Sequence, residues 1–388
     1  MFMENKIQTI GDCFLHHFLK PLLIVFLTAL SRPALAYRMG NVEINASGAA
    51  TETFDDNITY VKDNPKSDFI TTGALGLDVK YEGKTQSLDI IGRLYEQLFA
   101  KNSKFDNTPA SCILDFQKEF SRHDRLSIND GFLHTQQPVS FEDAFGRTPG
   151  RYGSYTNQFS LGYSHDISKQ MTLTGRYANE LDFFSSSDQS DSLLNSAGIS
   201  LQDALSSSAI LLFSYDLAVR SFDPGKSALT NSPTAGLTYY LTKKLYLEGS
   251  TGLDIIESYN DSGFCEPFVH LSLVHDVDKN TRAAIEFGHR FTTTAYEQNL
   301  FDYTKVSCSV TRQLLERLGV SFSGFYGEDK YIGAGIKDKL AGIGVGIAYD
   351  ILRHTKGILR YNYERELSNE STREYTKNWV SAGIRVDF

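Results

Sequence analysis

The sequence lacks any long apolar run after residue 36. A membrane-spanning helix needs about 20 consecutive apolar residues, so the sequence predicts none there. The mean hydropathy of −0.27 resembles that of a soluble protein. A membrane β-barrel has the same average, because only every second residue of its strands is apolar. The absence therefore excludes a helical membrane protein and leaves all-β classes open.

Cysteine is too scarce for a disulfide framework or a metal site. Cys13 lies before the apolar leader run and cannot be the lipid-carrying cysteine of a lipoprotein. The other three, Cys112, Cys265 and Cys308, are odd in number and far apart. They fit neither a complete set of disulfides nor a metal motif. We predict that they pack against lipid or neighbouring side chains, and we predict no metal or other cofactor.

A surplus of basic residues is also lacking. The chain has 38 Lys and Arg against 47 Asp and Glu, for a net charge of −9. This balance argues against nucleic acid as a partner, because binding to phosphate backbones needs a basic surface. It is compatible with outer-membrane lipid and lipopolysaccharide as neighbours, their phosphates bridged to the protein by divalent cations.

Recognisable catalytic motifs are missing. The sequence contains neither a G-x-S-x-G elbow nor an H-E-x-x-H zinc helix. His165, His275 and His354 lie in segments predicted to be tight turns, next to charged residues. They could form a catalytic dyad, but solvated turn residues are the preferred interpretation. We therefore predict no catalytic residues and no enzyme; an outer-membrane hydrolase is the least favoured function.

The first 36 residues have the organisation of a secretory signal. Lys20 precedes an apolar run from Leu22 to Leu30, and Ala34-Leu35-Ala36 has the A-x-A form of a cleavage site. The run is far shorter than the ~20 residues of a spanning helix, although an N-terminal membrane anchor is the alternative. We predict cleavage between Ala36 and Tyr37, with residues 1–36 as leader and 37–388 as one domain.

The C-terminus has the clearest strand pattern. Apolar and polar residues alternate strictly from Val380 to Phe388, so that one face of the strand is apolar and the other polar. The apolar face continues to the final residue, which is aromatic. A transmembrane β-barrel closes on its last strand, and that strand must therefore be complete.

Similar alternating runs repeat along the chain. They begin near residues 42, 69, 86, 110, 126, 153, 171, 191, 207, 228, 245, 263, 281, 301, 319, 338, 357 and 373. They are joined by polar tight turns, such as 241–244, in alternation with longer loops such as 55–68 and 101–109. The pattern predicts a single antiparallel up-and-down transmembrane β-barrel of about 18 strands, with both termini periplasmic. Sixteen strands is the alternative, because the runs near 126 and 301 are weak.

Charged residues occur regularly on the face opposite the apolar one. In a membrane barrel this face lines a wet lumen, where charges keep their hydration. A large soluble periplasmic β protein is the competing fold, and there the same face would be the outer surface. The residues predicted to line a pore are Asp89, Arg93, Asp115, Glu119, Arg176, Asp216, Arg220, Glu248, Asp254, Glu286, Arg290, Arg360, Glu364 and Arg385.

Two readings of these lumen charges remain open. Opposed acids and arginines could form a selectivity filter, or they could neutralise one another as a plug of salt bridges. The loop Val139 to Gly153 could fold inward as a constriction or remain an ordinary exposed loop; its candidate residues are Phe141, Phe145, Arg147 and Arg151. The glycine row Gly342-Gly344-Gly346 leaves room for a loop or ligand to pack closely.

Several features together resemble Gram-negative outer-membrane β-barrels. They are the start at Tyr37 after an A-x-A site, the loop Asp55-Asp56-Asn57, the Lys-containing turns and the ending Gly383 to Phe388. More narrowly, the chain resembles the putative β-barrel porin 2 family, some of whose members accompany exopolysaccharide or capsule systems. The resemblance implies transport, and it implies that Phe388 is a signal for the barrel assembly machinery.

Two functions follow as hypotheses from the pattern and the resemblance. One is a porin-like channel for small solutes or oligosaccharides. The other is a non-conducting barrel that anchors or guides a surface-polysaccharide export system.

Overall fold

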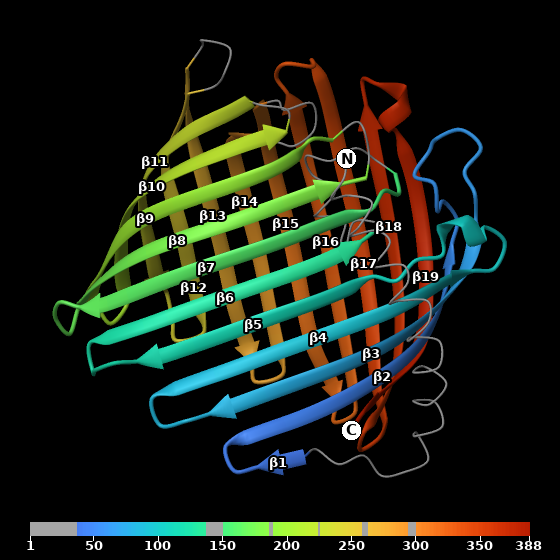
Figure 1. The fold of residues 1–388 in the computed structure, drawn as a ribbon, viewed down its shortest axis with the longest axis horizontal. Coiled ribbons are helices and arrows are strands. Elements are labelled where there is room, and N and C mark those ends of the chain that lie inside the picture. Colours follow the sequence, from blue (N-terminus) through green and yellow to red (C-terminus); the bar gives the residue numbers. More distant parts are fainter. Residues whose placement is uncertain (1–36, 137–149, 186–188, 224–225, 258–262, 294–299) are drawn as a thin grey trace.

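A computed structural model describes residues 37–136, 150–185, 189–223, 226–257, 263–293 and 300–388, and these form one sheet (Figure 1). Its strands are β1 (Tyr37–Met39), β2 (Val42–Asp55), β3 (Asp68–Glu82), β4 (Gln86–Phe99), β5 (Ala110–Glu119), β6 (Asp124–Thr135), β7 (Ser154–Asp166), β8 (Met171–Phe184), β9 (Asp191–Ser206), β10 (Ala209–Asp223), β11 (Lys226–Tyr240), β12 (Leu245–Glu257), β13 (Phe264–Asp278), β14 (Thr281–Thr293), β15 (Leu300–Leu315), β16 (Leu318–Tyr331), β17 (Ile336–Leu352), β18 (Thr355–Ser368) and β19 (Tyr375–Asp387). Two short 3-10 helices, η1 (Ser103–Phe105) and η3 (Ser371–Arg373), lie between strands.

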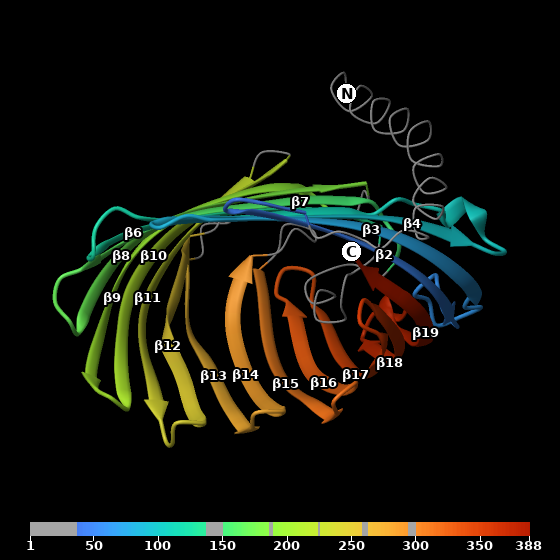
Figure 2. The same ribbon diagram turned by 90° about the horizontal axis from the view of Figure 1, so that it is seen from below.

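The sheet closes on itself as a barrel. Each strand from β2 to β19 pairs antiparallel with its neighbours in sequence, and β19 pairs with β2, from Trp379 opposite Asp55 to Asp387 opposite Ser47. Seen from below, the strands form a flattened ring (Figure 2). Closure leaves β2–β19 without the unpaired edge that lipid would not tolerate.

The closed wall has 18 strands, as predicted, and the alternative of 16 is wrong. Both weak runs are strands, β6 and β15. Their patterns are weak because polar residues interrupt the apolar face, Asp130 in β6, and Asp302 and Thr304 in β15. The three-residue strand β1 was not predicted; it folds back on β2 through Gly40, which has a φ of +61°.

The two ends of the barrel differ. At one end, here called the turn end, short connections join the strands in pairs, such as β11 to β12 and β17 to β18. At the other, here called the loop end, the connections include the longer 56–67 and 100–109. The barrel's first residue, Val42, and last strand residue, Asp387, both lie at the turn end. That this end faces the periplasm stays a prediction, as does the leader, which lies outside the described residues.

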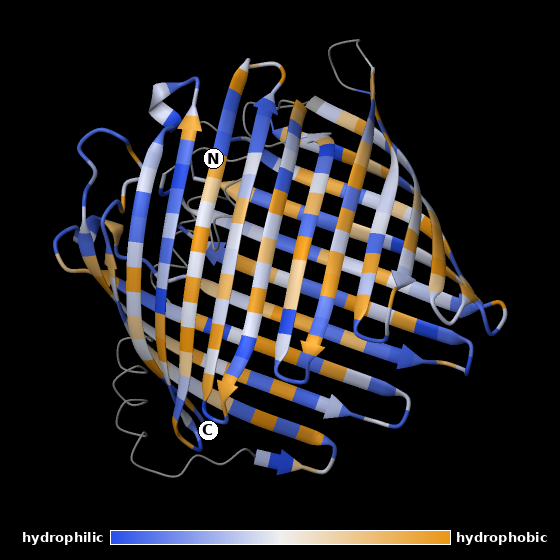
Figure 3. Ribbon diagram, turned by 180° about the vertical axis from the view of Figure 1, so that it is seen from behind, coloured by the Kyte–Doolittle hydropathy of each residue, from blue (hydrophilic) through white to orange (hydrophobic). Residues whose placement is uncertain are grey.

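The outward face is apolar and exposed. Val320, Ile347 and Leu359 face outward in one row across β16, β17 and β18, and Ile347 and Leu359 retain 38% and 47% of their accessible surface. Figure 3 shows how apolar and polar residues alternate along these strands. A soluble β protein would bury this face around a core. Its exposure excludes that competing fold and matches a surface that faces lipid.

Buried apolar side chains form no central core in the described residues. They gather in small clusters near the loop end, such as Ile58 with Ile70 and Phe99, and Phe301 with Tyr331 and Ile336. All three cysteines of the described chain are free and take outward positions. No helix among the described residues is long and apolar enough to cross a membrane.

Candidate functional site

The inward face of the barrel is polar and carries all of the predicted lumen charges. Residues that lie opposite each other in neighbouring strands face the same side of the sheet. Arg176 lies opposite Gly162 and Gly198, and Gly198 lies opposite Asp216, so these residues share one face. Following the strand register around the closed barrel places every predicted position on the inward side. These positions are Asp89, Arg93, Asp115, Glu119, Arg176, Asp216, Arg220, Glu248, Asp254, Glu286, Arg290, Arg360, Glu364 and Arg385. That they line a conducting pore stays a prediction.

Some inward arginines reach carboxylates two strands away. Arg176 of β8 forms a bidentate ion pair with Asp216 of β10, across β9 at Gly198. A side chain at Gly198 would overlap this pair, because an added Cβ would collide with Asp216 and lie 3.0 Å from Arg176 Nε. Glycine is thus required here by the close approach of two charged side chains.

Two further bridges repeat this geometry. Arg290 of β14 donates two hydrogen bonds, both 3.0 Å long, to Asp254 of β12. Arg220 of β10 donates to Glu180 of β8 at 2.9 Å and lies 3.5 Å from Asp182. Each pair lies across the face of the strand between its partners. Each bridge stiffens the inner wall and neutralises its arginine together with the bound carboxylate.

Acidic residues remain in excess on the inward face. In the described part of the chain, Asp89, Asp115, Glu248 and Glu286 form no ion pair with any basic side chain. Moreover, Asp89 lies directly opposite Asp115 across neighbouring strands. Asp254 and Glu266, and Asp329 and Asp338, face each other in the same way, but an arginine binds Asp254 and Asp338. Like charges at such positions destabilise a sheet unless cations or water screen them. The face therefore creates a negative potential along the lumen.

Connections at the loop end pack inward against the wall. Ile58 and Tyr60, in the segment between β2 and β3, are 0% and 6% exposed. Below them, the buried Lys377 of β19 pairs with Asp55 at 2.9 Å and lies 3.8 Å from the centre of the Tyr60 ring. A buried ammonium needs such partners, because burial without them would cost several kcal/mol. This part of the barrel mouth is thus filled.

The predicted constriction loop is only partly visible. Phe141, Phe145 and Arg147 lie outside the described residues. Arg151 is described: its Nε donates to the carbonyl oxygen of Ile58 at 2.7 Å, and its guanidinium lies 4.8 Å from the centre of the Phe99 ring. Its side chain is 3% exposed. Arg151 therefore connects the segment before β7 with the filled part of the mouth.

A second buried cluster was missed from the sequence. Arg373 of η3 donates to Asp338 at 2.5 Å and 2.9 Å, and to the hydroxyl of Tyr331 at 3.1 Å; Glu366 lies 3.7 Å away. No sequence pattern predicts Arg373, because it lies in a loop without periodicity and its partners are distant in the sequence. The cluster fixes the last long connection against β16, β17 and β18.

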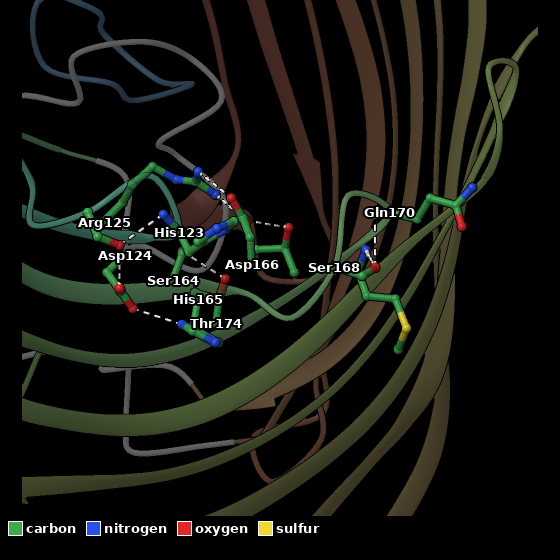
Figure 4. A network of polar contacts seen from close by, with 12 residues as sticks. His123, Asp124, Arg125, Ser164, His165, Asp166, Ser168, Gln170 and Thr174 are labelled. Atoms are coloured by element: carbon green, nitrogen blue, oxygen red, sulfur yellow. Dashed lines mark hydrogen bonds and ion pairs between the residues drawn. The ribbon is translucent and has the colours of Figure 1, made fainter.

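The turn-end histidine His165 does not form a nucleophilic triad with Asp124 and Ser121. His165 Nδ1 lies 2.8 Å from Asp124 (Figure 4). The Ser121 hydroxyl donates to the same carboxylate at 2.5 Å. In a nucleophilic triad the imidazole lies between the acid and the hydroxyl. Here the carboxylate lies between the other two, so His165 cannot accept the serine proton. The neighbouring Arg125 and Asp166 form a separate bidentate pair.

The comparisons with known proteins agree with this geometry. Residues 272–388 match the family Putative beta-barrel porin 2. The predicted resemblance is confirmed over these residues, which include the second half of β13, from Ser272, and all of β14 to β19. The protein is an integral outer-membrane β-barrel, and the exposed apolar exterior is what such a location requires.

Three solved bacterial structures share the fold. The chain resembles OccK2 (OpdF) of Pseudomonas aeruginosa with a TM-score of 0.50 and 9% identity, over 89% of this chain and 98% of that one. OccAB4 of Acinetobacter baumannii gives 0.50 and 10%, over 90% and 99%. The Pseudomonas aeruginosa protein opdK gives 0.50 and 8%, over 90% and 100%. At such low identity the likeness concerns the fold alone. No curated protein matches the sequence significantly.

Proposed function

We propose that this barrel is a diffusion channel for small neutral and cationic solutes, including short oligosaccharides. The observation that carries the proposal is the polar inward face, with an excess of acids that no basic side chain neutralises. A barrel of this strand number is wide enough for an aqueous channel. The loop end faces outside the cell, and both termini face the periplasm.

The excess of acids sets the preference of the channel. Carboxylates along a water-filled pathway attract cations and repel anions. Several arginines that could select for anions, such as Arg176 and Arg290, are held in ion pairs, and among the described residues Arg360 is an inward arginine without one. One structure of OccK2 holds glucuronate, an anion. We expect this chain to differ and to disfavour such acids, since its own inner charges decide its selectivity.

The inward-packed connections narrow the mouth of the barrel. The filled region around Lys377 and Arg151 lies against β2, β4 and β19. The inward hydroxyls on the far wall, such as Ser196 and Thr230, offer hydrogen bonds to sugars.

A non-conducting barrel is the second candidate function. The filled mouth favours it, because Ile58, Tyr60 and Lys377 occupy space that a channel would leave open. Such a barrel would anchor or guide a surface-polysaccharide machine. In either case we expect the barrel assembly machinery to read Phe388, and outer-membrane lipid to surround the apolar exterior.

Liposome swelling tests the channel directly. Vesicles containing the purified barrel are diluted into isotonic sugars of increasing size. We expect swelling with arabinose and glucose that slows as the sugars lengthen, and slower swelling with glucuronate than with glucose. A barrel that shifts in gel mobility on heating, as folded barrels do, but leaves vesicles sealed to every sugar contradicts the channel and favours the anchor.

A further inference from the structure

The outward face of β16, β17 and β18 carries a basic patch at its loop end. Lys330, Lys337, Lys339 and Arg365 make up this rim patch. Register places all four on the same side as the outward residues Ile343 and Val345 of β17. All four side chains are exposed. The rim patch therefore lies outside the barrel and takes no part in the lumen.

The patch is incompletely neutralised. Lys330 pairs with Asp302 at 3.2 Å and Lys339 with Glu328 at 3.0 Å. Among the residues that the structure describes, Lys337 and Arg365 have no carboxylate within ion-pair distance. Lys330 and Lys337 also lie directly opposite each other in neighbouring strands. Two facing ammonium groups repel, and an anion between them would relieve the repulsion.

The patch is local to this sector. At the loop ends of other strands, the outward positions hold acids and amides instead, such as Glu52, Glu96, Asp130, Asn157 and Asn195. The chain as a whole is acidic, at −9. A cluster of cations against this background singles out an anionic partner rather than general solubility.

The surface next to the patch indicates which anion. Towards the turn end, the same outward face continues into exposed apolar residues, among them Ile343, Val345, Tyr361 and Leu359. Figure 3 shows the polar upper ends of these strands and the alternating bands below. One partner would satisfy both surfaces: acyl chains along the apolar residues, with phosphate groups level with the cations. A soluble polyanion would use the cations alone.

We propose that the rim patch binds the phosphate groups of a phosphorylated glycolipid in the outer leaflet. Lys337 and Arg365 supply the unpaired positive charges, and the guanidinium of Arg365 can hold a phosphate with two parallel hydrogen bonds. The pairs Lys330–Asp302 and Lys339–Glu328 position the remaining ammonium groups beside it. The site is independent of conduction, and it requires only that the loop end lies at the outer leaflet.

Native mass spectrometry of the purified full-length barrel tests the site. The protein is exchanged into a mild detergent and titrated with bisphosphorylated lipid A, or with the same lipid after removal of both phosphates. The double variant Lys337→Gln/Arg365→Gln removes the two unpaired charges. The matched control is Arg312→Gln/Lys118→Gln, which removes two outward cations at the turn end.

The expected result is selective loss. The unmodified barrel and the control retain the phosphorylated lipid, and the rim variant retains it at least about tenfold less, as expected for two charge-assisted contacts weakened by solvent. Dephosphorylated lipid binds all three weakly and equally. Equal retention of phosphorylated lipid by the rim variant and the control would overturn the proposal.

Two other outcomes would also count against it. Competition by inorganic phosphate at the lipid's own concentration would show a site for free phosphate. Retention of an acidic polysaccharide, but not of lipid, by the unmodified barrel would assign the patch to an extracellular polymer. Because vesicle swelling is measured separately, a negative lipid-binding result does not contradict the proposed channel. Likewise, a barrel that conducts no sugar does not contradict the proposed lipid site.

Discussion

At the scale of single residues, glycine decides where charges can meet. The ion pair between Arg176 and Asp216 passes over Gly198, whose added Cβ would collide with the Asp216 carboxylate. Gly175, on the neighbouring strand β8, faces outward and has nothing within 4 Å of an added Cβ. The same substitution at the two positions therefore separates crowding from the general effect of replacing glycine.

We expect Gly198→Ala to lower the free energy of unfolding by about 1 kcal/mol, since the pair must shift to admit the methyl group. Gly175→Ala should change it by less than about 0.5 kcal/mol. Urea titration in lipid vesicles, followed by the fluorescence of Trp379, the only tryptophan, measures both. Equal effects of the two substitutions would show that a methyl group at position 198 does not displace the Arg176–Asp216 ion pair.

Asp68 is a second residue with a defined effect, at the tip of the loop end and outside the apolar band. Burial alone would raise the pKa of its carboxyl group. Hydrogen bonds from the side-chain amide of Asn102 and from the backbone N–H groups of Lys101, Phe69 and Asn102 together lower the pKa by more than burial raises it. The net pKa is below that of the unfolded chain. Asp68 therefore contributes fully to folding stability above the pKa of the unfolded chain, about 4. This contribution is lost as the pH falls through the lower pKa of the folded chain.

This predicts acid-induced loosening of the connection between β4 and β5. Hydrogen exchange at the Lys101 and Asn102 amides, corrected for intrinsic rates, should be slow at pH 7 and accelerate below about pH 4. Asp68→Asn should exchange quickly at both pH values. Asp63→Asn, in the exposed loop between β2 and β3, is the control and should behave like the unmodified chain. Continued slow exchange in Asp68→Asn would contradict the assignment.

At the scale of elements, the last strand closes the barrel. β19 pairs with both β18 and β2, and the backbone N–H of Phe388 donates to the carbonyl oxygen of Ala46 at 2.8 Å. Deletion of Phe388 removes this bond and the terminal aromatic. We expect little change in the stability of the refolded protein, because the remaining pairs of β19 persist.

Assembly in cells should suffer much more, by about tenfold in the amount of heat-modifiable protein, if Phe388 is the signal that directs assembly. Phe388→Tyr keeps an aromatic terminus and should restore it. Outer-membrane fractions compared by gel mobility before and after heating give the measurement. Normal assembly without Phe388 would leave the residue with a packing role only.

Strand positions could be predicted from sequence because the two-residue period is local. Each expected start falls close to an observed one, from Val42 to Tyr375. The inward position of the charged residues could be predicted from the same two-residue alternation. The bridges across β9 and β13 could not be predicted, because they depend on partners two strands away in three dimensions. Lys377 and Arg373 were missed for the same reason, since their partners come from distant loops and strands.

At the scale of the whole molecule, the two faces of the sheet have different roles. The outward face meets lipid, and its rim patch is proposed to hold phosphate. The inward face keeps carboxylates such as Asp89 and Asp115 opposite each other, where water and cations must screen them. An acidic wall around an aqueous path makes a definite electrical prediction.

Single-channel recording in planar bilayers tests the central claim most directly. The purified barrel should give steady steps whose size rises with salt, and a reversal potential in a KCl gradient that shows a preference for cations. Asp89→Asn/Asp115→Asn should weaken that preference, whereas Asp63→Asn, outside the wall, should not. A correctly folded, heat-modifiable barrel that stays electrically silent, or that prefers anions, would contradict the account.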